Sequence, residues 1–425
     1  MAETTDAMAE STDARGGIVI VGGGAAGTAC AQALSAAGGR AVLIDARPEP
    51  AELPPLSKSL FADDLDLRPH PRELPGIEAL AGTVERIAED AVHLADGTAV
   101  PYGTLVLATG LRPRPAPPAL RGAHLVSDAE AARGLRAQAP GRELGILGSG
   151  FLALEAARGA ADAGLTPTVH LRGALPLPGL HPHTARAVRD LHAAAGVRFA
   201  PYDPEPAPAA HPLWLAAVGA EPALPPLPQG WQSDARGFAE VDAWLRLIGA
   251  GERAYAIGDA AHVLRGPMAG YPPTAAESVA LSQGAWLGAR LADPRLGGGD
   301  EPGPDEPGAG EAVAAWTDVP WHWSFQGPVR VFTAGMPASS ADPDAVIVGD
   351  LSVGRGQALL FESRGDDAEL VGAETLGLPP AHTAARRVLA ARLEGGAGEG
   401  RAQLTRGEAA REGFDLRQWA RAHRG

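Results

Sequence analysis

Two glycine-rich turns, each placed between an apolar run and an alanine-rich stretch, constrain the fold of this chain most. The first joins Ile18–Val21 to Gly22-Gly23-Gly24-Ala25-Ala26-Gly27, and the second joins Leu144–Leu147 to Gly148-Ser149-Gly150-Phe151-Leu152-Ala153. Each apolar run predicts a buried strand, and each alanine-rich stretch predicts a helix. In such a unit the glycines allow a tight turn, close approach to a pyrophosphate and close helix packing, and the helix N-terminus faces the phosphates. Two such units predict two dinucleotide sites.

Composition supports a globular protein of several domains. The chain has 425 residues, of which 45% are hydrophobic and 20% charged, as is typical of globular proteins. Its net charge of −15 argues against general binding of nucleic acid, which needs a basic surface. The uncharged run Gly16–Gly39 is long enough for a membrane span, but the Gly22–Gly24 cluster would interrupt a helix, so a strand, turn and helix explain it better. We expect no membrane contact.

Targeting, cysteine and histidine patterns add further expectations. The acidic start Met1–Asp13 lacks the positive n-region of a signal peptide, which favours a cytoplasmic protein. The single cysteine, Cys30, excludes an intramolecular disulfide and is expected only to pack on the helix after the first turn. The 12 histidines show no metal-ligand spacing, so we predict no metal site.

Three further segments add polar groups suited to the first dinucleotide. Asp45 ends the predicted strand Arg40–Asp45, where a carboxylate accepts from the adenosine ribose hydroxyls; the alternative is a surface aspartate at a strand end. The apolar run Thr104–Ala108 leads into Thr109 and Gly110. Later, Ala254–Ile257 leads into Gly258 and Asp259, where an aspartate can bind a ribityl hydroxyl and nearby N–H groups a phosphate. The predicted binding set from these segments is Gly22, Gly24, Ala26, Gly27, Asp45, Thr109, Gly110, Gly258 and Asp259.

The order of these motifs resembles a known family. The more specific markers are Pro-Leu-Ser-Lys at 55–58, Ala-Thr-Gly at 108–110, Gly-Asp at 258–259 and the tryptophan segment Val319–Gln326. Together they are similar to FAD-dependent NAD(P)H:ferredoxin reductases of the oxygenase- and P450-coupled type. These putidaredoxin reductase-like proteins belong to the pyridine nucleotide-disulfide oxidoreductase superfamily. The resemblance covers roughly Gly17–Glu394.

The resemblance implies an α/β fold with two Rossmann-like dinucleotide-binding domains of the glutathione-reductase type and a C-terminal α+β domain. The FAD-binding domain would be discontinuous, over 17–115 and 240–295, with a truncated NAD(P)-binding domain over 116–239. A disordered leader would occupy 1–16 and a flexible linker 296–312. The C-terminal domain would span 313–394, with strands near 329–333, 345–348, 357–362 and 370–375 and a helix over 381–394, before a tail over 395–425.

The resemblance also assigns the reacting residues. It implies that Lys58 lies near the reactive end of the isoalloxazine, Trp323 near the ring, and Glu155 near the nicotinamide. Alone, Lys58 could be a solvated lysine, and Trp321 with Trp323 could be an aromatic pair that fills a core. A cationic Lys58 beside a flavin would favour the anionic reduced ring.

The absence of a redox cysteine between Asp45 and Phe61 indicates how electrons would move. The flavin itself would accept two electrons as a hydride and release them singly to a ferredoxin. Together with this, the resemblance implies electron transfer from NAD(P)H through FAD to a ferredoxin that feeds a P450 or a ring-hydroxylating oxygenase, by a monomer or homodimer. The alternative is an FAD-binding protein or pathway-specific flavoenzyme with a decayed nicotinamide site.

The second glycine unit departs from the family pattern. Gly148 and Gly150 are kept, but Arg172 follows the next strand where an NADH enzyme would place an acid. An arginine there could pair with a 2′-phosphate, which favours NADPH over NADH, or it could be a solvated strand end. The proline-rich stretch 201–208 cannot form ladder strands, so we expect the family's meander to be missing.

Overall fold

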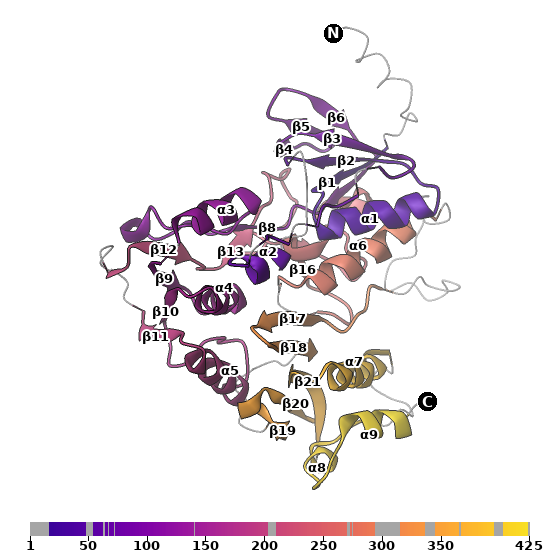
Figure 1. Ribbon diagram of the computed structural model, residues 1–425. Helices are drawn as coiled ribbons and strands as arrows, with labels where there is room; N and C mark the ends of the chain where they lie inside the picture. Colours follow the sequence, from indigo (N-terminus) through magenta and orange to yellow (C-terminus); the bar gives the residue numbers. More distant parts are fainter. Residues whose placement is uncertain are drawn as a thin grey trace. The chain divides into compact units, whose positions relative to one another are not determined.

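The computed structural model describes most of the chain (Figure 1). The described residues are 17–47, 54–62, 64–66, 68–71, 73–139, 141–202, 210–269, 273, 275–293, 315–335, 345–364, 367–394 and 403–423. They form two compact units, each assembled from separate parts of the chain. The first unit takes its residues from Met1–Glu52, Arg68–Arg112 and Glu221–Asp318, and the second from Leu53–Leu67, Pro113–Ala220 and Val319–Gly425. The expected leader over 1–16 and linker over 296–312 lie outside the described residues.

The first unit is built on a parallel sheet of five strands in the order β15-β7-β1-β2-β3. The strands are β1 (Ile18–Val21), β2 (Ala41–Asp45), β3 (Ile77–Ala81), β7 (Thr104–Leu107) and β15 (Ala254–Ala256). Two helices, α1 (Ala25–Ala36) and α6 (Glu277–Leu291), lie side by side (Figure 1). The prediction for Cys30 is confirmed, because its side chain is buried in α1.

Smaller elements complete the first unit. An antiparallel sheet contains β4 (Val84–Ile87), β5 (Ala91–Leu94) and β6 (Ala99–Pro101). A second pair, β14 (Ala239–Val241) and β16 (Ala261–Val263), is parallel, and the 3-10 turn η4 (Gly258–Ala260) precedes β16. The chain passes between the units at β8 (Leu111–Pro113) and at β13 (Ala220–Pro222).

The second unit holds the other glycine turn on a parallel sheet of four strands, in the order β11-β10-β9-β12. Its strands are β9 (Glu143–Leu147), β10 (Thr166–Leu171), β11 (Arg198–Pro201) and β12 (Leu213–Ala216). The helices are α2 (Pro54–Ser59), α3 (Ala129–Gln138), α4 (Phe151–Asp162) and α5 (Pro182–Ala194). Only residues 202–212 connect β11 to β12, and 203–209 lie outside the described part. A connection this short leaves no room for a three-stranded meander.

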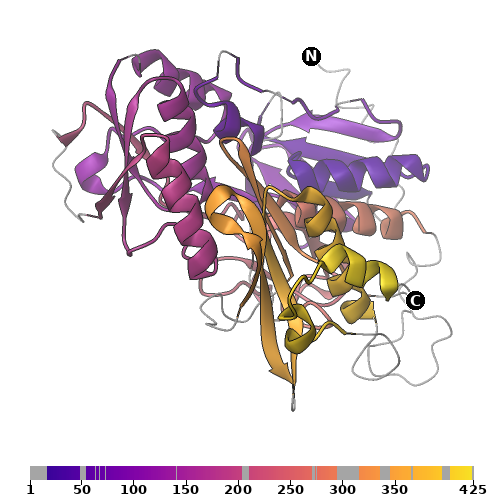
Figure 2. The ribbon, with the colours of Figure 1, turned by 60° about the horizontal axis from the view of Figure 1, so that its bottom comes forward.

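An antiparallel sheet of five strands, in the order β17-β18-β21-β20-β19, forms the C-terminal part of the second unit (Figure 2). The strands are β17 (Trp321–Gln326), β18 (Val329–Gly335), β19 (Val346–Asp350), β20 (Arg355–Arg364) and β21 (Asp367–Leu376), followed by α7 (Pro379–Glu394). The four strands and the helix predicted in this region are confirmed. Two short helices, α8 (Arg406–Ala409) and α9 (Leu416–Ala422), then pack on the same core as α7 through Ala409 and Leu416, and Leu404 just before α8 joins them there.

Candidate functional site

The first glycine turn leaves β1 at the carboxyl edge of the parallel sheet. Gly22 has a φ of +107°, and a Cβ there would collide with the carbonyl of Ala108 at the end of β7, so only glycine fits. No atom lies within 4 Å of the place that a Cβ on Gly24 would take. The backbone is therefore open at the position where the motif needs close approach to a pyrophosphate.

Asp45, at the end of β2, lies beside this turn. The Gly23 N–H donates to its Oδ2 at 2.6 Å, and the Arg47 N–H donates to its Oδ1 at 2.7 Å. Burial by itself would raise the pKa of Asp45, but the hydrogen bonds and charge of Arg47 and the Gly23 N–H outweigh it, so the pKa is lowered. Asp45 is thus an ionised acceptor fixed at the turn.

Two buried polar atoms at the same sheet edge have no hydrogen-bond partner. They are Oγ1 of Thr109, two residues after β7, and Oδ1 of Asp259, three residues after β15. Asp259 accepts the N–H of Ala276, yet burial raises its pKa to about 7. Because buried polar groups are nearly always hydrogen-bonded, these atoms indicate a ligand that supplies hydroxyl groups. They fit the ribityl chain of FAD.

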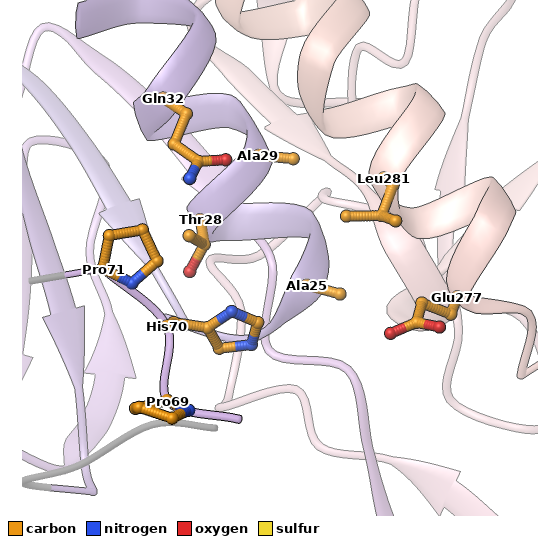
Figure 3. A pocket seen from close by; sticks show the side chains of 9 residues that line it. All are labelled: Ala25, Thr28, Ala29, Gln32, Pro69, His70, Pro71, Glu277 and Leu281. Carbon is orange, nitrogen blue, oxygen red and sulfur yellow. The ribbon is translucent and has the colours of Figure 1, made fainter. Parts of the chain in front are cut away.

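A small pocket lies next to the start of α1 (Figure 3). It has a volume of about 140 Å³, below the range of usual ligand pockets. The residues that line it are Ala25, Thr28, Ala29, Gln32, Pro69, His70, Pro71, Glu277 and Leu281. It is too small for a dinucleotide, and we assign no ligand to it.

The second glycine turn leaves β9 in the same way. Gly148 has a φ of +140°, and a Cβ there would collide with the carbonyl of Ala217, while the space at Gly150 is open. Leu177, buried with a φ of +53°, donates its N–H to the carbonyl of Ser149 at 2.8 Å. A non-glycine residue in this conformation is strained, so the surrounding fold must hold it against the turn. Arg172, directly after β10, places its guanidinium 5.3 Å from the centre of the Tyr202 ring.

Lys58 and Glu155 meet in the second unit, brought together from α2 and α4. The Lys58 ammonium lies 3.2 Å from Oε1 of Glu155 and 4.4 Å from the centre of the Trp323 ring on β17. Thus the structure joins the three residues that the resemblance names as reactive. It also changes the electrostatic interpretation of Lys58, because a buried carboxylate already compensates its charge.

Glu155 is surrounded by donors that the sequence interpretation missed. The hydroxyl of Ser57 donates to Oε2, and Oε1 accepts from the Ser324 hydroxyl at 2.5 Å and from the Phe325 N–H at 3.1 Å. Gln326 in turn donates from Nε2 to Oγ of Ser324 at 2.6 Å. A carboxylate with this many hydrogen-bond donors is held in one orientation. The sequence offered one sign of these donors, because Ser57 lies within Pro-Leu-Ser-Lys and Ser324 within the tryptophan segment.

Thiol chemistry is absent from the arrangement. The only cysteine is Cys30, and burial raises the pKa of its thiol to about 12, so it is an inert core group. No group of three histidine, cysteine or acidic side chains suited to a metal occurs in the described ranges. In those same ranges no helix is long and apolar enough to cross a membrane.

Comparison with known proteins gives consistent results. The family model for pyridine nucleotide-disulphide oxidoreductases matches residues 16–202. Rhodocoxin reductase of Rhodococcus erythropolis is 30% identical, over 94% of this chain and 93% of its own length. The ferredoxin–NAD(+) reductase component of the anthranilate 1,2-dioxygenase system of Burkholderia cepacia is 31% identical, over 88% of this chain and 94% of its own length.

Solved structures share the fold. The ferredoxin reductase for the CYP199A2 system from Rhodopseudomonas palustris gives a TM-score of 0.75 at 24% identity, covering 95% of this chain and 99% of that one. Putidaredoxin reductase, in its covalent complex with putidaredoxin, gives a TM-score of 0.75 at 22% identity, covering 97% and 99%. The two Rossmann-like sheets and the C-terminal α+β part are therefore those of this class. The chain belongs to the ferredoxin reductases of the pyridine nucleotide-disulphide oxidoreductase family, whose members use FAD and a pyridine nucleotide.

Proposed function

We propose that the protein passes electrons from NAD(P)H through FAD to a ferredoxin that feeds a cytochrome P450 or a ring-hydroxylating oxygenase. The observation that carries the proposal is the Lys58–Glu155 ion pair against Trp323, beside a glycine turn, in a chain whose only cysteine is inert. The names of the relatives support it, since they are reductases of ferredoxins and of oxygenase systems. Since NAD(P)H is a compound of the cell interior, the proposal includes a cytoplasmic location.

The first unit would hold FAD. In this proposal Gly22, Gly24, Ala26 and Gly27 shape the turn that receives the pyrophosphate, and Asp45 accepts from the adenosine ribose. Thr109, Gly110, Gly258 and Asp259 face the rest of the cofactor, with the unpartnered Oδ1 of Asp259 accepting from a ribityl hydroxyl. Bound FAD supplies the chemistry of accepting two electrons together and releasing them singly.

The second unit would hold NAD(P)H and orient it. Gly148 and Gly150 receive the pyrophosphate of the coenzyme. Glu155 fixes the Lys58 ammonium at the place where hydride is transferred, and the Trp323 ring lies against that ammonium. Ser57 and Ser324 donate to Glu155 and fix its orientation, so that Lys58 acts as one half of an ion pair. The Lys58–Glu155 ion pair presents polar groups to the coenzyme and carries no net charge.

The coenzyme preference is a finer part of the proposal. Arg172 follows β10, where the motif would recognise the ribose of the coenzyme, and its guanidinium lies 5.3 Å from the centre of the Tyr202 ring. A guanidinium at this position would pair with a 2′-phosphate. We therefore propose NADPH over NADH. The Burkholderia relative carries NAD(+) in its name, so relatives of this class do not all share that preference.

The test is anaerobic mixing of the purified yellow protein with NADPH or NADH. Rapid loss of the flavin absorbance is the expected result. Added ferredoxin should then accelerate the reduction of cytochrome c, while glutathione disulfide should give no turnover, because no thiol is available to relay electrons. Persistent yellow colour with both coenzymes would contradict the proposal.

Persistent colour would instead support a second function, that of an FAD-binding protein or pathway-specific flavoenzyme with a decayed nicotinamide site. The observation in its favour is the short connection between β11 and β12, which is too short for the family's three-stranded meander. Release of FAD from the denatured protein, together with failure of either coenzyme to bind, would establish this alternative.

A further inference from the structure

One histidine of the tryptophan segment has no role in the function proposed above. His322 lies on β17, one residue before Trp323, and its side chain therefore points to the opposite face of the strand, the face that Ser324 shares. Ser324 bonds Glu155 on α4, and His322 stacks on Phe151, four residues earlier on the same helix. The two rings are 4.6 Å apart and inclined by 22°. β17 and α4 are thus joined at two points one helical turn apart.

This register places His322 between the two ends of the coenzyme site. Phe151 is the first residue of α4, directly after Gly150 of the second glycine turn, where the pyrophosphate would bind. The other neighbour is Lys58, whose positive charge acts on the His322 ring. In NAD(P)H the nicotinamide riboside connects the pyrophosphate to the carbon that gives up hydride. A coenzyme that reaches from the turn to Lys58 therefore presents its nicotinamide half to His322.

The ring of His322 is neutral at physiological pH, and its surroundings select one tautomer. Burial, and then the charge of Lys58, lowers the pKa of His322 to about 4. Its Nδ1 is buried and has no hydrogen-bond partner. A buried N–H without an acceptor is rarer in proteins than a buried acceptor without a donor, so the proton belongs on Nε2. The other ring nitrogen, Nε2, makes no hydrogen bond within the described residues, and its surface is not fully buried. The accessible edge of the ring is therefore an N–H donor.

We propose that His322 is a positioning residue for the coenzyme, whose Nε2–H donates a hydrogen bond to the carboxamide oxygen of the nicotinamide. The stack on Phe151 fixes the plane of the imidazole, and the hydrogen bond fixes the rotation of the nicotinamide ring. This inference rests on the proposed function, because it requires that NAD(P)H binds beside the second glycine turn. The neutral imidazole would thus recognise the coenzyme by donating an N–H to the oxygen of a planar carboxamide.

The decisive variant is His322→Phe in the flavin-loaded protein, because phenylalanine keeps the stack on Phe151 and loses only the donor. We expect the Kd for NADH and NADPH, from the saturation of flavin reduction, to rise about 3- to 10-fold, as for the loss of one neutral hydrogen bond. Calorimetric titration with the oxidised coenzymes should give the same ratio without any turnover. His93→Phe on β5 is the control and should change neither value. FAD content and melting temperature verify folding.

Two coenzyme analogues locate the contact. Reduced nicotinamide mononucleotide lacks the adenylate, so the His322→Phe ratio should persist with it; loss of the ratio would overturn the assignment to the nicotinamide half. The reduced thionicotinamide coenzyme replaces the carboxamide oxygen by a poorer acceptor. The wild type should bind it more weakly than NAD(P)H and the variant should not discriminate; equal discrimination by both proteins would overturn the carboxamide contact.

Failure of this inference and failure of the proposed function give different results. If neither coenzyme reduces the wild-type flavin, the proposed function is wrong. If the wild type is reduced and His322→Phe has the wild-type Kd for both coenzymes, the function stands and the role of His322 is wrong.

Discussion

The two glycine turns have the same backbone design, but the polar side chains around them differ in whether they have hydrogen-bond or ion-pair partners. Around the first turn, Oγ1 of Thr109 and Oδ1 of Asp259 are buried without partners. Around the second, the charged groups of Lys58 and Glu155 satisfy each other, with Ser57 and Ser324 as further donors. The second site also has buried atoms without partners, Nδ1 of His322 and Oε1 of Gln326, but its two charged groups balance each other without a ligand, whereas the buried carboxyl of Asp259 has no such partner among the described residues. The first suits a resident cofactor and the second a substrate that binds and leaves.

The largest effect is expected from Glu155→Ala, which removes the acceptor that completes the second site. Lys58 would remain as an uncompensated, largely buried cation, and the free energy of unfolding should fall by about 3 kcal/mol. Flavin reduction should slow as well, because nothing then fixes the ammonium. Chemical denaturation of the flavin-loaded protein measures the first effect and stopped-flow absorbance the second.

The matched control lies on the same helix. Arg158 and Asp162 form an exposed i,i+4 ion pair at 2.9 Å on α4, so Asp162→Ala should cost less than about 1 kcal/mol. A loss of stability of equal size in both variants would show that the Glu155 cluster is not a special feature of α4, and the contrast between the two turns would lose its basis.

Asp259→Ala should give the opposite pattern. Because Oδ1 of Asp259 has no partner without a ligand, the variant should weaken FAD binding by about 1–3 kcal/mol and leave the stability of the deflavinated protein unchanged or higher. Fluorescence titration of the stripped protein with FAD gives the affinity, and thermal denaturation without FAD gives the stability. A deflavinated variant that melts well below the wild type would make Asp259 a structural residue.

Much of this organisation could be predicted from the sequence because it is local. The glycine turns, the strands before them and the C-terminal elements each follow from patterns within a short stretch. The second site could be predicted only in part, because Ser57, Glu155 and Ser324 come from three distant segments that the topology brings together. The role of Lys58 as half of an ion pair, and the place of His322 against Phe151, depend on the packing of β17 on α4. No spacing in the sequence encodes that contact.

Coenzyme choice should respond to Arg172→Glu. If Arg172 pairs with a 2′-phosphate, the substitution replaces attraction by repulsion, and the preference for NADPH over NADH should reverse, with a change of about tenfold for each 1.4 kcal/mol. The ratio of kcat/KM for the two coenzymes is the measurement. Arg198→Glu, at an exposed ion pair on β11, is the control and should leave the ratio unchanged. Equal use of both coenzymes by wild type and variant would remove Arg172 from the site.

An effect smaller than that of Glu155→Ala concerns the pH dependence of stability in the second unit. His322 has a pKa of about 4 in the folded protein, below its ordinary value of 6.5, so the unfolded chain binds more protons between these two values. Its neutral ring therefore favours the folded state above about pH 6.5, and this contribution is lost as the pH falls toward 4. His322→Phe cannot titrate, so the difference in unfolding free energy between wild type and variant should change by about 2 kcal/mol between pH 7 and pH 4.5, at about 1.4 kcal/mol per unit of pKa difference. Denaturation of the flavin-loaded proteins at pH 7 and pH 4.5 measures it. A difference independent of pH would mean that His322 keeps its ordinary pKa and that Lys58 and burial do not hold it neutral.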